Sequence, residues 1–258
     1  MSSKQAPKIR LSPGVEAHHE SDSVAIEEPL AIKVNGMHFA TLMRSPGREH
    51  DLAAGFLASE SAIDGNDEIA AFKECATQNT VNIALADGVD FSMNKSRNFV
   101  VGSSCGVCGS QSIEDLQREL NSSAVMQLKE INIQSLLDAL DKMRDSQQLF
   151  RATAGTHGVA LFDLNKQLII DLAEDVGRHN AVDKVIGKQL LEGNYPLQQP
   201  IVLLLSGRVS FDMVQKAARA NIGAICAVGM PTSLAIESAQ AVGMKLYAWA
   251  RKGSVCLY

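Results

Sequence analysis

The alternation of hydrophobic and polar residues changes character about two thirds of the way along the chain. From residue 180 onward, segments with helical spacing of apolar residues alternate with short continuous apolar runs. The runs 201–206, 224–229 and 245–250 are typical of strands buried on both faces. The intervening segments 181–191, 211–220 and 233–242 are typical of helices. This order predicts an α/β fold with a mostly parallel sheet and helical crossovers.

Hairpins are predicted before that point. Residues 30–43 alternate around Asn35 and Gly36, which suit the positive φ angles of a two-residue turn, and residues 158–170 give a second hairpin. Apolar residues recur at helical spacing in 52–57, as a short amphipathic helix, and in 133–143, and residues 80–85 alternate as a strand. We therefore expect a hairpin-rich part over 24–125 and an α/β part over 126–258 that share one interface. Residues 1–23 lack apolar periodicity, so we expect a mobile tail with at most an edge strand near Ile9.

Bulk composition narrows the class of protein. Hydrophobic residues make up 46% and charged residues 21%, as in ordinary globular chains. No apolar run approaches the roughly 20 residues of a membrane-spanning helix, and the amino terminus has no secretion-signal pattern, so a cytoplasmic protein without a membrane partner is expected. The net charge of -5 offers no basic footprint for nucleic acid. Five cysteines with a single close pair do not form a disulfide framework, so they are expected to be reduced.

The close pair, Cys105 and Cys108, is the sharpest chemical feature. Gly106 permits unusual backbone angles that expose sulfur. Ser112 and Asp115 have the spacing of a capping box that opens a helix over 113–120, and a helix amino end is expected to lower a nearby thiol pKa. A single CxxC, however, fits redox chemistry, sulfur transfer or half of a zinc site equally well.

Zinc is the weakest of these three interpretations. Structural zinc needs two further ligands, whereas Cys75, Cys226 and Cys256 stand alone and are interpreted as small apolar core residues. Zinc nucleobase deaminases carry their second pair of ligands as Pro-Cys-x-x-Cys, whereas here Ser104 precedes Cys105. No permanently bound metal is therefore predicted. Thiol-disulfide exchange stays open as the second interpretation, although exchangers carry the pair in the first turn of a helix and this pair precedes the predicted cap.

Two polar clusters at helix starts are candidate binding sites. Residues 174–184 place His179 among charged side chains, where a capped, solvated helix start is as good an interpretation as a role in proton transfer. Ser206, Gly207 and Arg208 follow the buried strand 201–205. The carboxyl end of such a strand, followed by a helix amino end, suits an anionic ligand such as a phosphate.

Five stretches taken together resemble one protein family. They are residues 27–36, 43–57, 103–109, 174–187 and 206–217, and in that order they look like the FdhD family of formate dehydrogenase accessory proteins. The resemblance spans Glu27 to Tyr258 and is far more specific than one CxxC.

This resemblance implies a cytidine-deaminase-like fold without zinc ligands, a homodimer, and a cytoplasmic sulfur carrier. It implies that sulfur comes from a cysteine desulfurase and goes to the bis-molybdopterin guanine dinucleotide cofactor of formate dehydrogenase. Cys105 matches the persulfide-bearing cysteine and Cys108 its partner. The family's cofactor-binding stretch corresponds to Trp249, Ala250, Arg251, Lys252, Gly253 and Ser254, with Ser206, Gly207, Arg208 and His179 expected to help hold the phosphates. A non-covalent molybdenum-cofactor chaperone is the alternative from another class.

Overall fold

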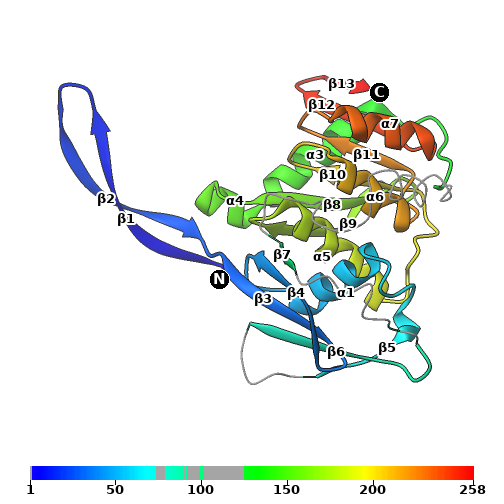
Figure 1. Ribbon diagram of the computed structural model, residues 1–258. Coiled ribbons are helices and arrows are strands. Elements are labelled where there is room, and N and C mark those ends of the chain that lie inside the picture. Colours follow the sequence, from blue (N-terminus) through cyan, green and yellow to red (C-terminus); the bar gives the residue numbers. More distant parts are fainter. Residues whose placement is uncertain (1, 74–78, 90, 92–98, 102–124) are drawn as a thin grey trace.

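The computed structural model describes residues 2–73, 79–89, 91, 99–101 and 125–258, and it contains two large sheets with helices between them (Figure 1). One sheet has six strands in the order β13-β12-β11-β10-β8-β9. These are β8 (His157–Asp163), β9 (Leu168–Asp175), β10 (Ile201–Leu205), β11 (Ala224–Ala227), β12 (Lys245–Arg251) and β13 (Ser254–Leu257). The other has five strands in the order β5-β6-β3-β4-β7, namely β3 (Glu28–Val34), β4 (Met37–Arg44), β5 (Ile69–Lys73), β6 (Thr80–Leu85) and β7 (Phe99–Val101).

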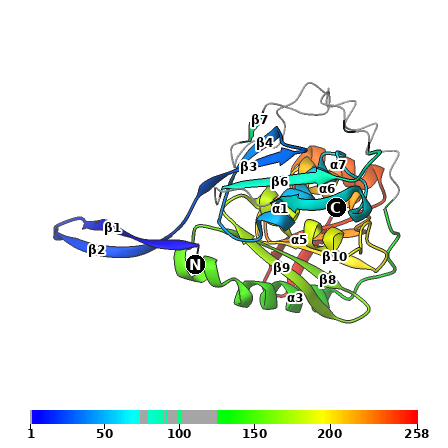
Figure 2. The same cartoon turned by 90° about the horizontal axis from the view of Figure 1, so that it is seen from below.

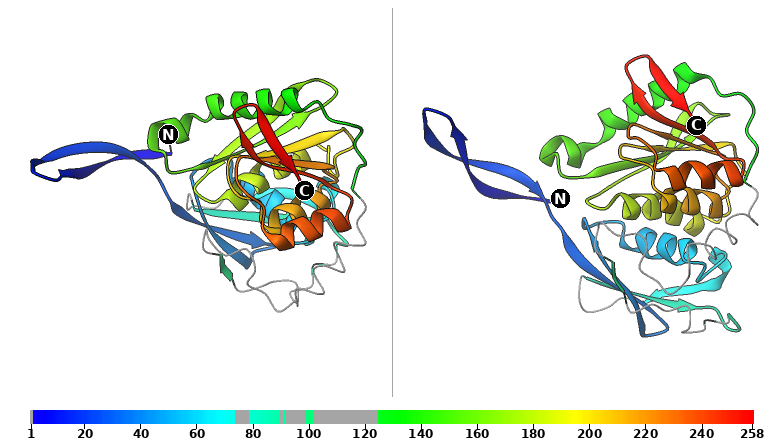
Figure 3. Two further views of the ribbon diagram at one scale, coloured as in Figure 1. Left: turned by 90° about the horizontal axis from the view of Figure 1, so that it is seen from above. Right: turned by 45° about the horizontal axis from the view of Figure 1, so that its top comes forward.

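The helices build the layers around these sheets. They are α1 (Glu49–Ser59), α3 (Ile133–Ser146), α4 (Gln148–Thr153), α5 (Arg178–Leu191), α6 (Phe211–Arg219) and α7 (Ser233–Ala241), with a short 3-10 turn at Asn66–Glu68. α3 packs on one face of the six-stranded sheet, and α5 to α7 cover the other (Figure 2). α1 lies between α5 and the five-stranded sheet (Figure 3). None of the helices in the described residues is long and apolar enough to span a membrane.

The expectation of a mostly parallel sheet is wrong. Only the pairs β10–β11 and β11–β12 are parallel, whereas β8 pairs antiparallel with both β9 and β10, and β12 pairs antiparallel with β13. The helical crossovers are confirmed, because α6 joins β10 to β11 and α7 joins β11 to β12. The hairpins at both ends of the alternating region add the antiparallel strands, so the fold is a mixed α/β fold. The cytidine-deaminase-like arrangement stays a prediction.

Most elements predicted before residue 180 are confirmed. The turn between β3 and β4 has φ angles of 50° at Asn35 and 84° at Gly36, as the sequence requires. The strand at residues 80–85, the helix after residue 132 and the β8–β9 hairpin are also present. α1 is present but is not amphipathic in its environment, because residues 52–59 are all buried. It is covered by a sheet on one side and by α5 on the other.

Two glycines allow α1 and α5 to touch backbone to backbone. A side chain at Gly55 would overlap the backbone oxygen of Asp183, and one at Gly187 would overlap that of Asp51. This contact brings α5 and the six-stranded sheet against the hairpin-rich part of the chain. The proposed division at residue 125 stays a prediction.

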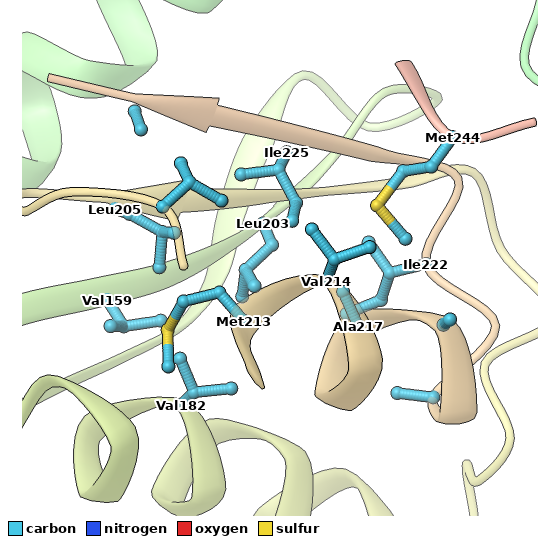
Figure 4. Close-up of a cluster of buried hydrophobic side chains, with 14 of the residues drawn as sticks. Val159, Val182, Leu203, Leu205, Met213, Val214, Ala217, Ile222, Ile225 and Met244 are labelled. Atoms are coloured by element: carbon cyan, nitrogen blue, oxygen red, sulfur yellow. The ribbon is translucent and has the colours of Figure 1, made fainter. Parts of the chain in front are cut away.

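The main apolar core lies between the six-stranded sheet and helices α5 to α7. Figure 4 shows Leu203, Leu205 and Ile225 of the sheet facing Met213 and Val214 of α6. A second core lies between α1 and the five-stranded sheet, and a third between α3 and the opposite face of the six-stranded sheet. The continuous apolar runs of β10 and β11 are explained by the main core and the third core, because each of these cores buries one face of their sheet.

Residues 3–25 form a paired ribbon, which corrects the expectation of a tail with at most one edge strand. β1 (Ser3–Ser12) and β2 (Val15–Ala25) pair antiparallel and project from the body as an arm (Figure 1). None of its residues is buried, so hydrophobic periodicity gave no signal. Pairing is instead favoured by cross-strand ion pairs such as Lys8–Asp22, with 2.6 Å between Nζ and Oδ2.

Candidate functional site

The carboxyl ends of β10, β11 and β12 meet along one edge of the six-stranded sheet. The loop after β10 is fixed there by its backbone, since Gly229 N donates to Gly207 O over 3.0 Å and Trp249 N donates to Gly229 O over 3.1 Å. A side chain at Gly229 would lie 2.5 Å from Gly207 O, so only glycine fits between the two loops. Ser206 Oγ accepts a hydrogen bond of 2.9 Å from Gly158 N at the start of β8. Ser206, Gly207 and Arg208 therefore follow the buried strand β10, as the sequence predicts.

A cluster of basic side chains gathers at this edge. Arg178 and His179 lie in the first turn of α5, Arg208 follows β10, and His157 begins β8. A methyl group on Gly207 would lie 3.3 Å from Nδ1 of His157, which places the imidazole over this loop. Neither α5 nor α6 has a side-chain hydrogen bond at its N-cap. We call His157, Arg178, His179 and Arg208 the cationic cluster.

Asp212, in the first turn of α6, is the acidic member of this site. Its Oδ2 lies 3.4 Å from Nε2 of His179 and accepts a hydrogen bond of 3.2 Å from Ser210 Oγ. The first distance is long for a hydrogen bond, and the contact is an ion pair only when the imidazole is protonated. Asp212 is not among the site residues predicted from the sequence, where 211–220 is predicted only as a helix. An acidic residue two positions after a possible N-cap was the available signal.

The pKa values in the cluster reflect burial and mutual repulsion. Burial lowers the pKa of His157, and the charges of Arg178 and His179 lower it further, while Asp175 opposes them. The pKa of Arg178 is lowered by burial and by Arg208. Burial alone would raise the pKa of Asp212, but its contact with His179 holds it below the usual value overall. An anion bound here would relieve the repulsion among the basic groups.

The titration of His157 provides a test of this site. Its lowered pKa means that the unfolded state binds more protons below about pH 6.5, so this residue reduces stability as the pH falls through that value. Inorganic pyrophosphate is expected to raise the pKa of His157, because it offsets the charges of Arg178 and His179. The imidazole signal in a proton NMR titration, assigned with a His157→Gln variant, measures the shift. An unchanged pKa at saturating pyrophosphate would contradict an anion site.

Residues at the end of β12 form a second part of the same edge. Trp249 has a φ of 56°, a backbone conformation that costs energy for a large side chain, and the residue is 43% exposed. Cζ of Arg251 lies 3.6 Å from the centre of that ring. Arg251 Nη1 also donates to Val228 O over 2.9 Å, so this guanidinium is held in place.

Arg251 and its neighbours in the predicted stretch also face α3, on the opposite side of the sheet from α5. Ala250, Arg251, Lys252 and Gly253 line a cavity of about 620 Å³ together with Arg144 and other residues of α3. Ser254 begins β13 and is exposed. The predicted binding residues therefore form two groups, one beside α5 and α6 and one beside α3, connected along the strand ends.

Several charged residues of 174–184 are structural. Asp175 is fully buried and accepts hydrogen bonds from Ser45 N and Gly177 N, and it forms an ion pair of 2.7 Å with Lys184. Lys184 also donates to Ser45 O. The helix start is therefore held by the buried pair of Asp175 and Lys184 rather than by a solvated cap, while Arg178 and His179 belong to the cationic cluster. A role of His179 in proton transfer stays a prediction.

The cysteines separate into three groups. Cys105 and Cys108, as well as Cys75 and the predicted helix over 113–120, lie outside the described residues. Cys226 is a core residue as predicted, and its burial raises the pKa of its thiol to about 12. Cys256 is exposed on the edge strand β13, so its interpretation as a core residue is wrong. In the described part of the chain, no three His, Cys, Asp or Glu residues are grouped closely enough to hold a metal ion.

Comparisons with known proteins agree on one family. A family model described as the FdhD/NarQ family matches residues 25–258. The sulfur carrier protein FdhD of Streptomyces avermitilis is 40% identical over 248 residues, covering 92% of this chain and 87% of the relative. The protein of the same name from Corynebacterium efficiens is 38% identical over 243 residues, covering 89% and 86%. A crystal structure of a formate dehydrogenase accessory protein from Desulfotalea psychrophila shares the fold, with a TM-score of 0.77 and 24% identity over 100% of this chain and 97% of that one.

Proposed function

The chain belongs to the FdhD/NarQ family of sulfur carrier proteins, and from this premise we propose that it accepts sulfur on Cys105 and delivers it to a molybdenum cofactor destined for formate dehydrogenase. The donor is a cysteine desulfurase. The recipient is the bis-molybdopterin guanine dinucleotide cofactor, which is bound as a client. The protein acts in the cytoplasm as a homodimer.

The cationic cluster is the observation that supports cofactor binding in this proposal. The client is a polyanion, whereas this chain has a net charge of -5. Three basic side chains, those of Arg178, His179 and Arg208, nevertheless lie near the starts of α5 and α6, where Asp212 is the single acidic residue in the first turn of either helix. Helix amino ends combined with arginine are a recurrent means of holding phosphate. This edge supports binding of the phosphates of the dinucleotide.

The second group of residues suits the rest of the client. Trp249 offers an exposed aromatic ring, and Arg251 is stacked on it. Lys252 adds a positive charge beside the cavity against α3. A ligand that spans both groups must be long, as a dinucleotide is.

The proposed chemistry at the thiols conserves atoms and electrons. The Cys105 thiolate attacks the outer sulfur of the desulfurase persulfide, which forms Cys105-S-SH and releases the desulfurase thiolate. Attack of the Cys108 thiolate on the Cys105 sulfur then forms the Cys105–Cys108 disulfide and releases the outer sulfur as sulfide to the bound client. A thiol reductant returns the pair to the dithiol. The two cysteines become oxidised by two electrons, and the transferred sulfur becomes reduced by two.

Mass spectrometry tests the covalent step. After incubation with a cysteine desulfurase and cysteine, the peptide that contains Cys105 is expected to gain one sulfur atom that dithiothreitol removes. A Cys108→Ser variant should accumulate this adduct, because the step that releases sulfide is blocked. An adduct found on another cysteine, with none on Cys105, would reject the assignment. Binding of the cofactor without any adduct would favour a non-covalent chaperone.

A further inference from the structure

The arm formed by β1 and β2 has no role in the proposed sulfur chemistry, yet its direction is fixed at its base. Ser2 Oγ donates to Pro46 O over 2.6 Å, and Ile26 N donates to Ser2 O over 2.8 Å. α4 packs against the base of both strands. Beyond this base, the ribbon extends away from the body in every view (Figures 1 and 3). An isolated two-stranded ribbon is only marginally stable in water, so its far half calls for a covering surface.

The two faces of the arm differ in chemistry. The register pairs Ile9 with His19 and Pro7 with Ser21 on one face, and Lys8 with Glu20 and Arg10 with His18 on the other. The first face, which we call the neutral face, carries Gln5, Pro7, Ile9, Ala17, His19, Ser21 and Ser23, with no Asp, Glu, Lys or Arg. The other face holds the ion pairs that Lys8 and Arg10 make with Asp22 and Glu20.

Apolar side chains are concentrated towards the tip. Ile9 is 54% exposed, Leu11 77% and Val15 59%. They lie at the end of the arm furthest from the body, where no other part of the described chain covers them. A face that is uncharged and apolar at its far end is suited to burial against another protein surface.

The charges of the arm and the edge of β1 indicate which part of the arm binds a partner. The charged residues of β1 are Lys4, Lys8 and Arg10, and those of β2 are Glu16, Glu20 and Asp22, so the arm has no net charge and two arms do not repel each other. Pro7 has no N–H group, which disfavours addition of another strand along β1. The neutral face, rather than the strand edge, is therefore the docking surface.

The size of the face favours a second copy over any other partner. Strands of 10 and 11 residues give one face of roughly 300 Å², at about 3.3 Å per residue and about 4.8 Å per strand. Docked on an unrelated protein, one arm buries only about 600 Å² in total, which is typical of weak contacts. Two arms exchanged across a twofold axis bury about 1,200 Å², the lower limit for a stable dimer.

We propose that the neutral face of the arm clasps the body of a second copy of this chain, so that two exchanged arms hold the dimer together. This inference rests on the homodimer proposed above and assigns it a surface. Burial of Ile9 on the neutral face is the main gain, with Leu11 and Val15 beside it at the tip, and the charged face stays in solvent.

Sedimentation velocity over a range of protein concentrations tests the arm. Ile9→Asp and Leu11→Asp are each expected to weaken the dimer at least about tenfold, which corresponds to about 1.4 kcal/mol. His18→Asp adds the same charge to the opposite face and should leave the dissociation constant unchanged. All three side chains are exposed in the single chain, so far-UV circular dichroism should confirm that each variant folds. Hydrogen exchange at the arm amides should quicken on dilution of the wild type.

The outcomes separate the two levels of the proposal. A wild-type chain that is monomeric at all concentrations would reject both the dimer and the arm. A dimer that is indifferent to Ile9→Asp and Leu11→Asp would reject the arm alone. Loss of formate dehydrogenase binding in these variants, with the dimer intact, would also reject it, because the arm would then serve a different partner. None of these readouts depends on sulfur transfer.

Discussion

Replacing Cys105 by serine is expected to reduce formate dehydrogenase maturation at least about 100-fold, because a hydroxyl group cannot accept a sulfur atom as a persulfide. The proposed route passes every transferred sulfur through this one side chain. The same variant should still bind guanine nucleotides, since the cationic cluster is formed by α5, β8 and the loop after β10. Formate dehydrogenase activity in cells that lack the native protein measures the first effect, and equilibrium dialysis with GDP measures the second.

Cys256→Ser provides the matched control. Cys256 is an exposed free thiol on β13, so its loss tests whether any accessible cysteine suffices. Maturation should be unaffected. Full maturation by Cys105→Ser would instead favour a chaperone that hands over its cofactor without covalent chemistry. Catalysis of insulin reduction by the wild type would favour a thiol-disulfide exchanger.

Elements were predicted correctly where the number of buried faces of a strand or helix determines its pattern of apolar residues. β10 and β11 are apolar throughout because α3 covers one face of their sheet and α6 the other. The β3–β4 hairpin was predictable because Asn35 and Gly36 select its turn. Strand direction was not predictable in the same way. β8 has the composition of a buried strand whichever way it runs, and only its pairing with β10 shows that these two strands are antiparallel.

The arm and the α1–α5 contact were missed for opposite reasons. The arm buries nothing in the single chain, so its pattern resembles that of a disordered tail. α1 is buried on nearly all sides, and its tight approach to α5 depends on Gly55 and Gly187, which are 132 positions apart in the chain. A glycine within a helix indicates a weak helix unless its partner is known.

At the candidate site, the sequence indicated which loops carry the site residues, but it did not indicate which side chains contact each other. Ser206, Gly207 and Arg208 were recognisable because they follow a buried strand. Nothing in the sequence connected Asp212 to His179, because their proximity arises only when α5 and α6 lie side by side. The same limitation applied to Asp183 and Lys184, adjacent residues with different buried partners, one on α6 and the other on β9.

Removing the carboxylate of Asp183 is expected to destabilise the fold by about 3–5 kcal/mol, because it leaves a buried ammonium without its counter-charge. Lys216 Nζ lies 2.7 Å from Oδ1 of Asp183, and the two side chains are 8% and 1% exposed. Ser59 Oγ donates to the same oxygen over 2.7 Å, so one carboxylate connects α1, α5 and α6. Urea unfolding of Asp183→Ala at neutral pH measures the loss.

Two control variants show whether the loss of stability in Asp183→Ala comes from the buried ion pair. Asp141→Ala breaks the exposed pair with Arg144 and should cost no more than about 1 kcal/mol. Asp183→Leu combined with Lys216→Met removes both charges and should recover most of the stability lost by Asp183→Ala. If Asp183→Ala cost no more than Asp141→Ala, the buried pair would not connect the helices. Since Arg178, His179 and Asp212 lie at the starts of α5 and α6, the double variant should also retain pyrophosphate binding, because it keeps the two helix starts together.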